Sequence, residues 1–84
     1  MDDAAIQEEL VVTLRKPVML GDISYTQLVL REPTADEWAQ FDKVLGIEGD
    51  IVAVALVSGI PAHAVRKIGA RDFKKAARFI ASFL

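Results

Sequence analysis

Several kinds of chemistry are excluded by what this 84-residue sequence lacks. It contains no cysteine, so disulfides, thiol nucleophiles and thiolate zinc sites are absent. Its single histidine, His63, has no pattern of acidic or histidine neighbours that would supply a catalytic base or a set of metal ligands. The glycines are scattered, so no glycine-rich phosphate loop exists. We therefore expect a protein that is not an enzyme and that uses neither a cofactor nor a metal ion.

Long apolar runs are also absent. The longest, residues 51–57, is far shorter than the roughly 20 residues of a membrane-spanning helix. The first residues are acidic, whereas a secretory signal peptide begins with basic ones. We expect a soluble cytoplasmic protein, with a flexible N-terminus over residues 1–9 and a single domain over residues 10–84.

Charge is unevenly distributed along the chain. Residues 1–60 carry four basic and eleven acidic side chains, a balance of −7, whereas residues 61–84 carry six basic and one acidic, a balance of +5. Such a polarity indicates either a partner for the basic part or attraction between the two parts.

Apolar alternation predicts an N-terminal β-hairpin. Residues 10–16 and 23–31 have the β-branched, alternating pattern of strands. Pro17 should lie at the edge or end of the first strand, and the loop around Gly21 should be longer than the ideal two residues. Alternation divides the second strand into two faces, one with Ser24, Thr26, Leu28 and Leu30 and the other with Ile23, Tyr25, Gln27, Val29 and Arg31.

Two helices should follow the hairpin. Thr34 and Glu37 have the spacing of a capping box, in which each side chain bonds a free backbone N–H of the first turn. Asp50 should cap the next helix over residues 51–58, although residues 51–57 also fit a buried strand. The first of these helices should present one apolar stripe, made of Trp38, Phe41, Val44 and Leu45.

Two further helices complete the expected fold. Gly59 and Pro61 indicate a stop and a new start, giving a short helix over residues 62–68. Asp72 should open the last helix, residues 73–84. The fold class is therefore α+β, with an N-terminal β-hairpin followed by three to four α-helices.

The last helix carries the candidate partner-binding residues. Phe79 and Phe83 lie four residues apart, on a flank between its apolar and basic faces. Either one small core buries this wide stripe, or part of it is left exposed as an interaction site. We expect contacts to a partner from Phe79, Phe83, Ile80 and Trp38, with Lys75 and Arg78 at the rim.

DNA binding is an alternative for the basic third of the chain. Two helices separated by a turn superficially resemble a helix-turn-helix. However, the last helix lacks the Asn, Gln and Thr side chains that usually read bases, and the sequence pI is near 5.2. The cations then form the solvated face of an amphipathic helix. A small DNA-binding regulator is therefore a weaker hypothesis than a protein-binding domain.

The order of these features resembles one known family, the small tail assembly chaperones of contractile-tailed, Mu-like phages and related prophages. The resemblance spans residues 10–84. It is carried by the turn at residues 20–22, residues 25–34, the segment 56–61, Val65 with Asp72, and the helix ending at residues 79–84.

The resemblance implies a role in virion morphogenesis. Members are thought to bind the long tape measure protein and keep it soluble in the bacterial host cytoplasm while the tail tube polymerises around it. It implies no catalytic residue, and several copies could associate on one client. The matching positions Arg31, Glu32, Pro33, Gly59, Pro61 and Asp72 are expected to have structural roles in turns and caps.

Overall fold

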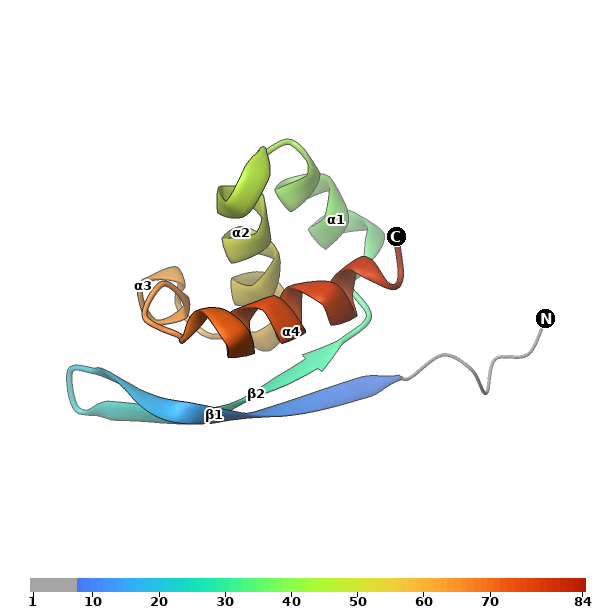
Figure 1. The fold of residues 1–84 in the computed structure, drawn as a ribbon. Coiled ribbons are helices and arrows are strands. Elements are labelled where there is room, and N and C mark those ends of the chain that lie inside the picture. Colours follow the sequence, from blue (N-terminus) through green and yellow to red (C-terminus); the bar gives the residue numbers. More distant parts are fainter. Residues whose placement is uncertain (1–7) are drawn as a thin grey trace.

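The computed structural model describes residues 8–84, in which an antiparallel two-stranded sheet is followed by four helices (Figure 1). This arrangement confirms the predicted α+β class. The expected flexible N-terminus falls largely on residues 1–7, outside the described residues, and the first strand begins at Glu9. The elements are β1 (Glu9–Leu20), β2 (Ile23–Arg31), α1 (Ala35–Asp42), α2 (Gly46–Ser58), α3 (Ala62–Val65) and α4 (Ala70–Ala81).

The helices cover one face of the hairpin. Both α2 and α4 contact the sheet, while α1 packs against α2. Figure 1 shows α4 running along the hairpin and the hairpin tip projecting past α3. One apolar core lies between the sheet and these helices, and its largest fully buried side chains are Leu28, Leu30, Ile80, Val12, Val54 and Val65.

The hairpin differs from its prediction in the length of β1. Only Gly21 and Asp22 connect the strands, so the expected longer loop is wrong. Gly21 has a φ of 62°, and glycine with positive φ at the first position of a two-residue loop is typical of a type II′ hairpin turn. Pro17 lies inside β1 because the pairing is interrupted there: the register changes between Thr13 and Val18.

This interruption is a large β-bulge that shifts the pairing register of the two strands. Thr13 pairs with Gln27 and Val18 with Tyr25, so residues 14–17 lie opposite one residue of β2. Bulges increase the local twist of a strand pair. As a result Tyr25, predicted on the face opposite Leu28, is also packed against the core, and strict alternation fails along β2.

The boundary between α1 and α2 also differs from its prediction. Of the expected stripe, Phe41 is buried, but Val44 and Leu45 lie beyond the end of α1. Residues 51–57 are helical, not a strand, and α2 begins at Gly46, so Asp50 is not its cap. A Cβ at Gly49 would lie 2.2 Å from the backbone oxygen of Val44. A glycine is therefore required where α2 passes close to the segment that joins it to α1.

The last two helices both end earlier than predicted, and the second of them also starts earlier. α3 has four residues instead of the expected seven, and α4 begins at Ala70, with Gly69 as its N-cap. Asp72 therefore lies within the first turn of α4, where it is buried and accepts the backbone N–H of Arg15 at 2.9 Å. α4 ends at Ala81, and Leu84, expected on the apolar face, is 53% exposed.

Candidate partner-binding groove

An open groove of about 670 Å³ lies between the N-terminal parts of α2 and α4, and we call it the α2–α4 groove. Its size falls within the roughly 300–1,000 Å³ of ligand-binding clefts. A smaller hollow of about 160 Å³ continues from it towards α3. The residues that line the groove are Gly46, Ile47, Asp50, Ala70, Arg71, Phe73 and Lys74.

The surface of the groove is largely apolar. Ile47 lines both hollows and is 63% exposed, and Phe73, which also lines both, is half-buried against the core. Leu45, which comes directly before these lining residues of α2, is 86% exposed. Single exposed apolar side chains are common, but their concentration at one hollow is typical of an interaction site.

The two walls of the groove differ in charge. Arg71 and Lys74, both exposed, come from α4, and Asp50 comes from α2. Within residues 8–84, neither Arg71 nor Lys74 forms a salt bridge. These two cations are therefore available to a partner.

An ion pair lies beside the smaller hollow. The guanidinium of Arg66 donates to both carboxylate oxygens of Glu48, one of them at 3.2 Å. This hydrogen bonding lowers the pKa of Glu48 and raises that of Arg66. Because both groups are exposed, the pair contributes little to stability. It holds the side chain of Arg66, which lines the smaller hollow.

A buried carboxylate holds the first turn of α4 in place. Besides the backbone bond from Arg15, Asp72 has the Arg15 guanidinium 3.9 Å away. A third hollow of about 320 Å³ at this contact is lined by Arg15, Lys16, Gly69, Ala70, Arg71 and Asp72. The β1 bulge therefore positions the α4 wall of the groove and adds Lys16 beside Arg71.

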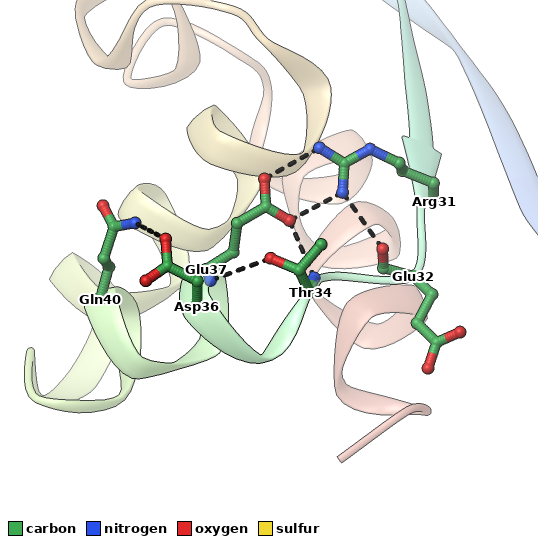
Figure 2. A network of polar contacts seen from close by, with 6 residues as sticks. All are labelled: Arg31, Glu32, Thr34, Asp36, Glu37 and Gln40. Atoms are coloured by element: carbon green, nitrogen blue, oxygen red, sulfur yellow. Dashed lines mark hydrogen bonds and ion pairs between the residues drawn. The ribbon is translucent and has the colours of Figure 1, made fainter.

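A second polar network, shown in Figure 2, joins β2 to α1. Arg31 donates to both oxygens of Glu37 at 2.7 and 2.9 Å and to the carbonyl of Glu32 at 3.1 Å. Thr34 and Glu37 form the predicted capping box. The hydrogen bonds from Arg31, followed by that from the Thr34 backbone, lower the pKa of Glu37 to about 2. These groups satisfy one another, so the network is structural.

The residues expected to contact a partner lie elsewhere. Phe79 and Ile80 are buried in the core, so that part of the stripe faces inward. Phe83, half-buried, packs edge-on against Phe79 with ring centroids 5.2 Å apart. Trp38 is 44% exposed on α1. Lys75 and Arg78 are exposed on α4. None of the six lines the α2–α4 groove.

Sequence reasoning missed the groove because its residues lie at or beyond the ends of the expected helices. Ile47 lies between two of them, and Phe73 lies at the start of the last one, whose candidate contacts were placed towards its other end. One signal was available: Ile47 is an apolar residue between two glycines, outside both neighbouring helices as they were expected.

Other kinds of site find no support in the part of the chain that the structure describes. Within residues 8–84, no three His, Cys, Asp or Glu residues are grouped so that they could hold a metal ion. In the same range, no helix combines the length and apolarity needed to cross a membrane. α3, the first helix of the suspected DNA-binding pair, is a single short turn.

Comparison with known proteins identifies the family. A family model described as "Phage tail assembly chaperone proteins, E, or 41 or 14" matches residues 11–84. No curated protein and no solved structure gives a significant match. The family match covers both strands and all four helices, including every residue of the groove. The chain therefore belongs to the phage tail assembly chaperones.

Proposed function

We propose that this chain binds the tape measure protein of its phage and keeps it soluble while the tail tube assembles around it. The family match supports an assembly role, and the observation that carries the more specific proposal is the open apolar groove around Ile47. A chaperone for a long helical client needs a surface that covers an apolar stripe, and a groove between helices is a recurring way to bind one.

The small size of the groove suits a temporary complex. Its lining residues come from the first turns of two helices, so one copy covers only a short stretch of a client helix. A small contact area leaves little free energy after the cost of association, so one copy should bind weakly and release readily. Several copies along one client would supply the total affinity, which is why self-association belongs to the proposal.

The terminal helix is proposed as a second part of the contact surface. Lys75 and Arg78 are accessible there, Phe83 is half accessible, and Trp38 is accessible on α1. The buried Phe79 and Ile80 would contribute by supporting Phe83. The role requires no catalytic chemistry, and we place it in the cytoplasm of the bacterial host, where tails assemble.

Co-expression tests the proposal. The tape measure protein is expressed alone, with the wild-type chain, with Ile47→Asp, and with Met19→Asp as the matched control at the hairpin tip. Met19 is 56% exposed, close to the 63% of Ile47, so both variants should fold. We expect the wild type and Met19→Asp to raise the soluble fraction and Ile47→Asp to do so much less. Equal solubility of the tape measure protein with and without the wild-type chain would refute the proposed function.

A further inference from the structure

We infer that the α2–α4 groove accepts a client helix whose apolar stripe is bordered by acidic side chains, with that acidic border against Arg71 and Lys74. This inference rests on the proposed function and specifies the chemistry of the segment that binds. Arg71 and Lys74 lie on the same wall, three residues apart on α4, and so are neighbours on one helix face.

Charge around the groove is asymmetric. The α4 wall carries two exposed cations without a salt bridge in residues 8–84, and the adjoining hollow adds Lys16, whereas its Arg15 is paired with Asp72. The α2 wall carries Asp50, while the nearby Glu48 is already bound to Arg66. A client with an acidic border would therefore gain attraction at the α4 wall, and one with a basic border there would be repelled.

The same arrangement gives a meaning to the charge polarity of the sequence. The +5 balance of residues 61–84 includes both groove cations, whereas the rest of the chain is acidic. An acidic border would therefore be attracted to the basic part of the chain, which contains the groove cations, more than to the acidic remainder. Charge would therefore help to direct the client to one face.

The apolar surface between the walls favours a protein client over a nucleic acid. Ile47 of α2 and Phe73 of α4 line the groove, and Leu45, which directly precedes the lining residue Gly46, is a further exposed apolar side chain. Phosphates gain nothing from aliphatic side chains, and contacts to a nucleic acid backbone are mainly polar and cationic. An amphipathic helix would place its apolar stripe against Ile47 and Phe73 and its acidic border against the cations of α4.

Two synthetic helical peptides test the inference by fluorescence anisotropy. They share one leucine stripe and differ only at the positions that border it, which carry glutamate in one and lysine in the other. An exposed ion pair changes affinity by a factor of about 1.5–5. With two cations involved, we expect the glutamate peptide to bind about tenfold more tightly, and the difference should shrink as salt is added.

Charge-reversed variants locate the effect. Arg71→Glu with Lys74→Glu should abolish or reverse the preference between the peptides. Lys43→Glu with Lys67→Glu, which reverses two exposed cations outside the groove and outside the proposed contact surface, is the matched control and should keep it. Equal unfolding midpoints of the two double variants would show that both remain folded.

The possible outcomes separate this inference from the proposed function. If the tape measure protein binds but the two peptides bind equally, the inference is wrong and the proposed function stands. If the control variant loses the preference instead, the acidic border meets another part of the protein surface and the inference is also wrong. Displacement of the glutamate peptide by duplex DNA, or by a second copy of the chain, would likewise overturn it. If neither the peptides nor the tape measure protein binds, the proposed function itself fails.

Discussion

Two helices of this protein have a glutamate three residues after the N-cap, but only one of them forms a capping box. α1 starts with Thr34 followed three residues later by Glu37, and α2 starts with Leu45 followed three residues later by Glu48. At α1 the threonine and glutamate bond each other's backbone N–H groups. At α2 the N-cap side chain makes no hydrogen bond, and Glu48 binds Arg66 instead.

The N-terminus of α1 is stabilised by its cap, whereas α2 has an exposed apolar residue at the N-cap position. Serine, threonine, aspartate and asparagine are preferred at N-caps, and leucine is among the poorest choices there. Leu45 is nevertheless 86% exposed in that position, beside the groove. Departures from local rules tend to occur at functional sites. We interpret the start of α2 as a surface kept for a partner at some cost in stability.

The largest expected effect comes from Gly49, which lets α2 pass close to the segment that joins it to α1. In Gly49→Ala the new methyl group would lie 2.2 Å from the backbone oxygen of Val44, so this segment must move away from α2. We expect the free energy of unfolding to fall by about 3 kcal/mol, as measured by urea denaturation. Gly69→Ala, where nothing lies within 4 Å, is the control and should cost less than about 1 kcal/mol. Similar losses in both variants would contradict the close approach.

Replacing Glu37 tests how much the capping box stabilises the N-terminus of α1. Glu37→Ala removes the capping box and leaves Arg31 without its bidentate partner. We expect a loss of about 1–2 kcal/mol in the free energy of unfolding. Glu32→Ala removes a neighbouring exposed carboxylate and should change it by less than about 0.5 kcal/mol. If Glu37→Ala and Glu32→Ala have equal free energies of unfolding, the network in Figure 2 does not stabilise the fold.

The same carboxylate predicts a pH dependence. The folded-state pKa of Glu37 is lowered from 4.5 to about 2, so the unfolded chain binds its proton more readily. Its contribution to stability is therefore fully present above about pH 4.5 and is lost as the pH falls towards 2. The difference in unfolding free energy between wild type and Glu37→Ala should shrink over that range. A difference that stays constant down to pH 2 would contradict the lowered pKa.

The smallest effect on stability, and the most informative for the comparison, is expected from Leu45. Leu45→Ser gives α2 the Ser-x-x-Glu frame of a capping box, and should raise the free energy of unfolding by up to about 1 kcal/mol. The same variant should weaken binding of the tape measure protein, because an exposed apolar side chain beside the groove is lost. Thermal unfolding and a pull-down check the two halves. A variant that is less stable than the wild type would assign Leu45 a structural role.

Much of the fold was predictable because its signals are local. The capping box of Thr34 and Glu37, the helical character of residues 51–57 and the second strand all follow from short patterns. The errors arise where distant residues meet. The buried contact between Arg15 and Asp72 joins residues 57 apart in sequence, so no local pattern indicated that β1 bulges or that α4 starts at Ala70.

The groove could not be predicted for the same reason. Its walls come from residues 46–50 and 70–74, and only packing brings them together. Ile47 has apolar residues at helical spacing in Ile51 and Val54, but the glycines at positions 46 and 49 indicate a break there. In contrast, the aromatic spacing of Phe79 and Phe83 was visible in the sequence, although the burial of Phe79 depends on the tertiary fold.

The central claim, that the α2–α4 groove is where the tape measure protein binds, is tested most directly by NMR. An isotopically labelled chain is titrated with a soluble tape measure fragment, and amide shifts are followed residue by residue. We predict that the largest changes fall on Gly46, Ile47, Phe73 and Lys74, which line the groove. Changes confined to Val11 and Val29, which pair on the open face of the hairpin, with the groove signals unmoved, would contradict the account.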